Sequence, residues 1–165
     1  MTQSSVLLYT TLAGLITLTF SGVLTWYLLK LPTGNDRMRD IANAIKTGAN
    51  AYLIKQYKVL AVIAALLFFF LGYFINWITG LGFLLGAVAS ALSGYLGMAV
   101  AVRANVRTAE AAKTGLSAAL GTAFRAGSIT GLTVAAMALL SVSVFYWLTG
   151  ELDALIGLAF GSSLI

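Results

Sequence analysis

The carboxylates are the side chains of this 165-residue chain best suited to chemistry, because it contains neither histidine nor cysteine. Asp36 and Asp40 stand one helical turn apart, a spacing that could hold a divalent cation. Arg37 and Arg39 lie beside them, and acidic groups in the first turn of a helix offset its dipole. We therefore interpret the pair as structural and not as a metal site.

The other three acidic residues have similar interpretations. Glu151 and Asp153 are predicted to lie in a solvated turn, and Glu110 has basic neighbours on its own helix. The missing residue types exclude thiol chemistry, zinc sites and an imidazole base. The sequence therefore predicts no catalytic, substrate-binding or metal-binding residue within this chain.

The apolar segments also lack the groups that an ion pathway needs. A pump requires ionisable side chains at membrane depth, yet no Asp, Glu, Lys or Arg lies in the interior of the four long apolar segments. Asn76 lies near a segment end. The hydroxyls at depth are predicted to serve helix packing: Thr17, Thr19, Ser90, Ser93, Ser141 and Ser143.

The elements that carry these residues are predicted to be membrane-spanning helices. Apolar residues make up 60% of the chain, charged residues only 9%, and 17 glycines are spread through the apolar runs. This composition indicates an all-α, polytopic transmembrane bundle forming a single domain over residues 1–165. Four complete spans and the start of a fifth are expected at 5–31, 59–78, 81–102, 126–148 and 155–165.

The charge distribution predicts orientation. All ten Lys and Arg residues fall within 30–58 and 103–125, and the connections at Thr79–Gly80 and Gly150–Glu151 carry none. The positive-inside rule places the basic segments in the cytoplasm and the N-terminus outside, as in a multi-pass protein of the plasma (inner) membrane. Topology explains the basic charge, so it does not indicate nucleic-acid binding.

The two cytoplasmic segments are predicted to be helical, at 34–58 and 103–125. Asn35 or Asp36 is a plausible N-cap for the first, which continues without a breaker into the second span. The second is expected to be one polar helix, and Thr79–Gly80 is expected to form a tight outer turn.

Small residues recur every four positions in two spans, which predicts close helix contacts in a bundle larger than four helices. The first set is Gly82, Gly86, Ser90 and Gly94, and the second is Gly127, Gly131 and Ala135.

The two polar segments contain the most specific patterns: Met38-Arg39-Asp40-Ile41-Ala42, Gly48-Ala49, Ala51-Tyr52-Leu53, Gln56-Tyr57, Ala104-Asn105-Val106-Arg107-Thr108-Ala109 and Phe124-Arg125-Ala126-Gly127-Ser128. In this order and spacing, they resemble the N-terminal helices of the membrane-integral pyrophosphatases, which are pyrophosphate-energised proton or sodium pumps.

The resemblance implies an N-terminal fragment of a longer all-helical homodimer in which Mg²⁺-bound pyrophosphate is hydrolysed to drive an ion across the membrane. The glycine-triplet and Lys/Asp motifs of the family would follow Ile165. No site residue is therefore carried over, and Arg107 and Asp40 are not assigned such a role. The full-length protein would be an enzyme, and this segment alone, expected to form a scaffold of outer helices, would be inactive.

Two alternatives are a small four-helix transporter and a non-catalytic structural subunit of a membrane complex. The transporter predicts a buried carboxylate and a chain that stops after a whole span. The structural subunit leaves the specific run at 104–111 unexplained.

Overall fold

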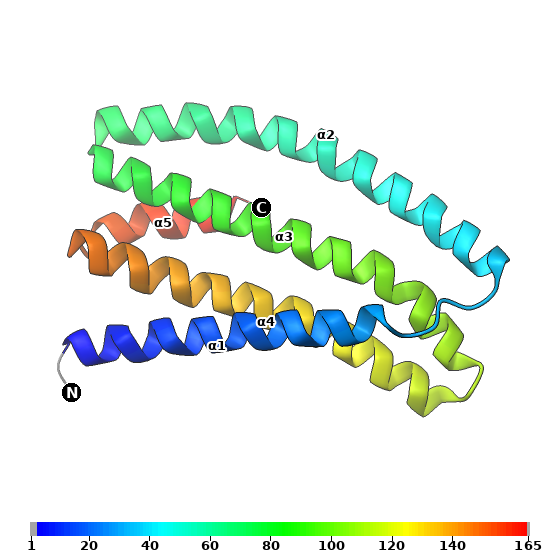
Figure 1. Cartoon of the computed structure of the whole chain (residues 1–165). Coiled ribbons are helices and arrows are strands. Elements are labelled where there is room, and N and C mark those ends of the chain that lie inside the picture. The colour runs from blue at the N-terminus through cyan, green and yellow to red at the C-terminus, as the bar shows by residue number, and fades with distance from the viewer. Residues whose placement is uncertain (1–2, 165) are drawn as a thin grey trace.

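The computed structural model describes residues 3–164, and every secondary-structure element among them is a helix (Figure 1). This confirms the predicted all-α class. The helices are α1 (Gln3–Leu29), α2 (Asp36–Phe74), α3 (Trp77–Ala112), α4 (Leu116–Thr149) and α5 (Ala154–Ser162).

The first four helices are long and apolar enough to cross a membrane. With 39 residues in α2 and 36 in α3, these helices are about 58 Å and 54 Å long at 1.5 Å per residue. A bilayer core is only about 30 Å thick. Each helix therefore continues well beyond its apolar part.

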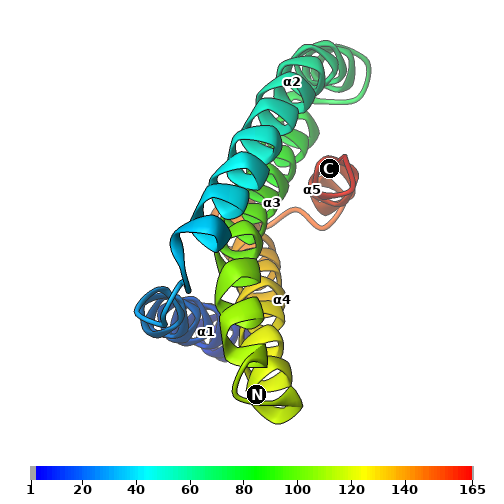
Figure 2. The same cartoon turned by 90° about the vertical axis from the view of Figure 1, so that its right-hand side faces the viewer.

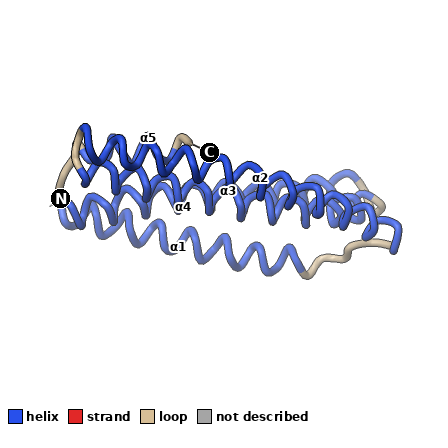
Figure 3. The backbone as a smooth tube through the Cα atoms, turned by 90° about the horizontal axis from the view of Figure 1, so that it is seen from above, coloured by secondary structure: helices blue, strands red, loops and turns tan. Residues whose placement is uncertain are grey.

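Helices α2, α3 and α4 form a row, with α1 and α5 on opposite faces of it (Figures 2 and 3). Helix α3 packs against α2, α4 and α5, whereas α1 packs mainly against α4. The first helix therefore lies beside the fourth and not beside its neighbour in sequence. The connection from α1 to α2 passes the basic end of α3 (Figure 1).

The fold gathers the basic residues at one end of the bundle. Lys30 follows α1, Lys113 lies in the turn after α3, and the other Lys and Arg residues lie in the N-terminal parts of α2 and α4 and the C-terminal part of α3. The turns at 75–76 and 150–153 lie at the opposite end (Figure 1). This arrangement separates charge along the helix axes, as the positive-inside prediction requires.

The structure corrects the position of the first turn between spans. Helix α2 ends at Phe74, and the turn lies at Ile75 and Asn76. Asn76 Oδ1 accepts a hydrogen bond from the Thr79 backbone N–H at 2.7 Å and so caps α3. The predicted turn at Thr79–Gly80 is therefore wrong, because both residues belong to the first turn of α3.

The prediction of one polar helix over residues 103–125 is also wrong. Helix α3 ends at Ala112, and α4 begins at Leu116 after a turn in which Gly115 has φ +142°. This backbone conformation suits glycine and interrupts the helix. In the first polar segment, Asn35 is the N-cap: its Oδ1 accepts from the Met38 N–H at 3.0 Å. Helix α2 begins at Asp36 and, as predicted, runs unbroken into the second span.

Helices α3 and α5 cross at close range through glycines on both sides. The four residues involved are Gly82, Gly86, Gly157 and Gly161. A Cβ atom on Gly86 would collide with the carbonyl oxygen of Leu158, and one on Gly161 with that of Phe83. The small-residue prediction for the third span is thus confirmed at Gly82 and Gly86, which allow two backbones to touch.

The second predicted set of small residues behaves differently. A Cβ atom added to Gly127 or Gly131 meets no atom within 4 Å among the described residues. Where α3 does approach α4, the glycine is on α3: a Cβ on Gly97 would lie 2.9 Å from the Thr130 methyl carbon.

Buried hydroxyls join α1 to α4. Ser21 Oγ donates to the Ile129 carbonyl oxygen at 3.1 Å and lies 2.7 Å from Thr133 Oγ1. Ser21 and Thr133 are both buried, and Leu28 packs nearby with Ile129 in an apolar cluster. Because lipid offers no competing hydrogen bonds, this contact fixes how α1 sits on α4.

The glycine crossing predicts a sharp difference between two conservative substitutions. Gly86→Ala places a methyl group against the α5 backbone and should lower the free energy of unfolding by about 1–3 kcal/mol, as overpacking does. Gly127→Ala enters open space and should not destabilise the protein. Thermal unfolding of both variants in detergent, followed by circular dichroism, tests this. Equal melting temperatures would contradict the close α3–α5 contact.

The orientation remains a prediction and can be tested by cysteine labelling, since the chain has no cysteine of its own. Glu151→Cys and Thr114→Cys place exposed thiols at opposite ends of the bundle. A membrane-impermeant maleimide applied to intact cells should label only the Glu151→Cys protein. Labelling of Thr114→Cys without permeabilisation would reverse the predicted topology.

Candidate functional site

Three features outside the tight helix contacts have the potential to carry function. They are a charged cluster at the basic end of α3, a hydroxyl-lined cavity among α3, α4 and α5, and a groove between α2 and α3.

Arg107 is the centre of the charged cluster. Its Nη1 donates to the Arg103 carbonyl oxygen at 2.6 Å, and its Nη2 donates to the Leu29 carbonyl oxygen at 2.8 Å. Leu29 is the last residue of α1, so this carbonyl has no partner within its own helix. Arg107 thus caps α1 from α3 and attaches the two helices at the basic end.

The electrostatic setting of Arg107 is consistent with a structural role. Burial, and secondarily the charge of Arg103, lower the pKa of Arg107 from its ordinary value. An arginine guanidinium nevertheless stays protonated in proteins, so the side chain remains a donor at all working pH values. It cannot act as a general base.

Glu110 lies on the same helix as Arg107 and pairs with Lys113, with Oε2 and Nζ 2.6 Å apart. This confirms the predicted pairing with a basic helical neighbour. The carboxylate also contacts the α1–α2 connection: a Cβ atom on Gly34 would lie 2.5 Å from Glu110 Oε2. Gly34 has φ +75°, so both its backbone and its surroundings favour glycine.

Asp36 and Asp40, the pair with metal-like spacing, do not form a metal site with other carboxylates. Asp36 Oδ1 lies 3.2 Å from Arg39 Nη1, and both acidic residues are exposed. Across residues 3–164, no three His, Cys, Asp or Glu side chains lie close enough together to hold a metal ion. The donor set that is present therefore does not fit a magnesium centre.

The cavity among α3, α4 and α5 has a volume of about 570 Å³. Its polar lining consists of four serines: Ser90, Ser93, Ser141 and Ser162. Ser93 donates to the Ala89 carbonyl at 2.8 Å, and Ser162 donates to the Ala159 carbonyl at 2.9 Å. These hydroxyls satisfy carbonyls of their own helices and do not join one helix to another.

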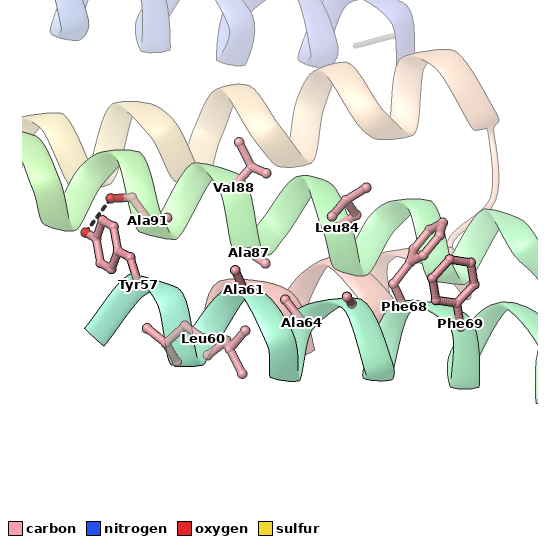
Figure 4. A pocket seen from close by; sticks show the side chains of 12 residues that line it. Tyr57, Leu60, Ala61, Ala64, Phe68, Phe69, Leu84, Ala87, Val88 and Ala91 are labelled. Atoms are coloured by element: carbon pink, nitrogen blue, oxygen red, sulfur yellow. Dashed lines mark hydrogen bonds between the residues drawn. The ribbon is translucent and has the colours of Figure 1, made fainter. Parts of the chain in front are cut away.

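The groove between α2 and α3 is almost entirely apolar and has a volume of about 410 Å³ (Figure 4). Tyr57 closes one end by donating its hydroxyl to the Ala91 carbonyl at 2.7 Å, and Phe68 and Phe69 line the other end. Such a lining cannot hold a charged substrate, because burying a charge without a partner is costly.

Two interactions were not predictable from the sequence, Tyr57 with Ala91 and Ser21 with Thr133. The only signal for Tyr57 was its place at the boundary between the polar and apolar parts of α2. Ser21 resembles every other hydroxyl of α1 until its partner helix is known.

The long apolar helices, separated charges and packing hydroxyls define a polytopic α-helical membrane protein. Its described polar groups stabilise helix ends and helix contacts. None of the three features carries a set of catalytic groups.

Comparison with known proteins gives the family. The profile described as inorganic H⁺ pyrophosphatase matches residues 15–165. The chain therefore belongs to this family, which confirms the resemblance seen in the sequence.

Three relatives illustrate the match. A K⁺-insensitive pyrophosphate-energized proton pump of Methanosarcina mazei is 47% identical over 158 residues, covering 93% of this chain and 23% of the relative. K⁺-insensitive pyrophosphate-energized proton pump 2 of Moorella thermoacetica is 41% identical, covering 92% and 24%. A K⁺-stimulated pyrophosphate-energized sodium pump of Thermotoga maritima is 39% identical, covering 85% and 20%. The chain spans about a quarter of the length of these relatives.

The cap provided by Arg107 predicts local loosening when it is removed. Arg107→Met leaves the Leu29 carbonyl without its donor and should lower the free energy of unfolding by about 1–3 kcal/mol. Backbone amides of residues 30–35 should exchange hydrogen faster, as measured by deuterium uptake. Arg37→Met removes an exposed arginine and should change neither value appreciably. Unchanged exchange in Arg107→Met would show that the bond does not hold the connection.

Proposed function

We propose that this chain forms the N-terminal part of a pyrophosphate-energised pump that couples hydrolysis of magnesium-bound pyrophosphate to translocation of protons or sodium ions. The observation that carries the proposal is the 47% identity to a proton pump, which extends over 93% of the chain. The full-length protein would be an enzyme and an ion translocase.

Within such a pump, the described helices would act as scaffold. An ion pathway requires ionisable groups at membrane depth, and the charges described here lie at the basic end or in the opposite turns. The close α3–α5 crossing and the Ser21–Thr133 contact instead support a rigid outer frame. A polypeptide of these residues alone is therefore expected to be inactive.

Magnesium would be required by the chemistry of the substrate and not by the residues described here. Metal ions neutralise the oxygens of a phosphoryl group and lower the pKa of a bound water, which turns it into a nucleophile. Since the carboxylates among residues 3–164 do not form a metal-binding group, the ligands would come from other parts of the pump.

The surroundings of the chain are also proposed. The exposed apolar faces of α1, α2 and α4 fit lipid or further helices. We place the protein in the plasma (inner) membrane with its basic end in the cytoplasm, following the charge asymmetry. A homodimer is the expected assembly of the full-length pump.

The proposal predicts enzymatic activity for the product of the complete gene. Purified into liposomes with Mg²⁺, it should release orthophosphate from pyrophosphate and build an ion gradient, whereas a polypeptide of residues 1–165 should release none above background. Collapse of the gradient by a protonophore indicates proton pumping, and dependence on sodium indicates sodium pumping. A complete product without pyrophosphatase activity would contradict the proposal.

A further inference from the structure

The outer face of α1 carries a shallow apolar groove of about 410 Å³. Its lining comes from this helix alone: Leu15, Ile16, Thr19, Phe20 and Val23. The same helical face continues at spacings of three and four residues through Val23 and Tyr27 to Lys30. An apolar surface therefore leads directly to a cation at the polar end of the helix.

Two cations each lie over an aromatic ring at this end of α1. Lys30 Nζ lies 3.3 Å from the centroid of the Trp26 ring. Arg125 reaches across from α4, with its Cζ 5.5 Å from the centroid of the Tyr27 ring. All four side chains are exposed. We call Trp26, Tyr27, Lys30 and Arg125 the cation–aromatic cluster. Its positive charges come from the end of α1 and from α4.

The two cations have no anionic partner among residues 3–164. The ion pairs in this part of the chain join Arg39 to Asp36 and Lys113 to Glu110. An aromatic ring attracts a cation through its quadrupole but carries no net charge. Lys30 and Arg125 therefore present two uncompensated positive charges, with N–H donors that suit phosphate oxygens.

The dimensions of the site match one leaflet of a bilayer. Counted from Tyr27, the groove between Val23 and Leu15 lies about 6 to 18 Å away along the helix at 1.5 Å per residue. Half of a hydrocarbon core is about 15 Å. Tryptophan and tyrosine characteristically lie at the boundary between headgroups and hydrocarbon. The rings thus mark the boundary, with the cations on its polar side and the groove on its apolar side.

We propose that this site binds one anionic glycerophospholipid, with its phosphate between Lys30 and Arg125 and an acyl chain along the α1 groove. The charges require an anion and the groove requires an apolar tail, and such a lipid supplies both. Another helix fits less well, because the close helix crossing in this protein, between α3 and α5, uses glycine on both sides. This face instead presents bulky side chains such as Ile16 and Phe20, which are 67% and 53% exposed.

The proposal can be tested by measuring lipid retention in native mass spectrometry, using the product of the complete gene. The protein is mixed in detergent with phosphatidylglycerol and phosphatidylcholine that have identical acyl chains. The ratio of bound anionic to zwitterionic lipid should fall roughly fivefold for Lys30→Gln or Arg125→Gln, given the strength of one cation near an anionic surface. The double variant should fall further.

The matched control is the double variant Lys46→Gln/Lys55→Gln, which makes the same charge change on exposed positions of α2. Its lipid ratio should stay at the wild-type value. An equal loss in both double variants would overturn the site, because it would show a general effect of net charge. Circular dichroism confirms that each variant keeps its helices.

A second arm distinguishes lipid from free phosphate. Glycerol phosphate, which has the headgroup chemistry without acyl chains, should compete poorly with phosphatidylglycerol. Phe20→Ser should weaken retention of both lipids by removing apolar lining. Equal competition by glycerol phosphate, together with unchanged retention in Phe20→Ser, would overturn the acyl-chain part of the proposal.

Discussion

Helices in lipid gain little from hiding apolar surface, because the surrounding hydrocarbon is as apolar as the side chains themselves. Association then depends on how closely two backbones approach and on the few hydrogen bonds between helices. Helix α3 meets this constraint with glycine on several sides: Gly86 faces α5, Gly97 faces α4, and Gly80 faces the α2 backbone, where a Cβ would lie 3.2 Å from the Phe68 carbonyl oxygen. The positions of α2, α4 and α5 follow from this central helix, whereas α1 packs mainly on α4.

The same constraint explains why the polar groups are concentrated at helix ends. Within the apolar region, hydroxyls such as Ser93 satisfy carbonyls of their own helix. Beyond it, charged side chains take over, and Arg107 satisfies the terminal carbonyl of a different helix. The basic end therefore does more than set topology, because it also holds the α1–α2 connection against α3.

Much of this fold was predictable from local sequence. Long apolar runs indicate spans, Asn35 precedes a helix as capping residues do, and Glu110 pairs with a lysine three residues away. The family was likewise recognisable from its motifs. No catalytic residue was predicted from the sequence, so there was no predicted site to compare with the structure. Local patterns gave a wrong prediction where the same residues are compatible with both a turn and a helix contact. Thr79–Gly80 has the composition of a turn but serves helix packing, and the true turn depends on the cap at Asn76.

Contacts between distant helices were not predictable from one sequence. On α1, Thr19 donates to Leu15 of its own helix, whereas Ser21 reaches α4, and nothing in the residue types separates the two. The polar hairpin at 113–115 was missed for a related reason, since a single glycine is tolerated in many helices.

The pairing of α1 with α4 has a consequence for biogenesis. Ser21 and Thr133 are 112 residues apart, so at about 5–20 residues per second the ribosome needs roughly 6–22 s to deliver the partner. During that interval, α1 resides in the bilayer without the neighbour it finally contacts. Many apolar residues of α1 are exposed even in the assembled bundle. The helix is therefore compatible with lipid before α4 is inserted. Helices α2 and α3 are inserted during this interval, and α4 then packs between α3 and the much earlier α1.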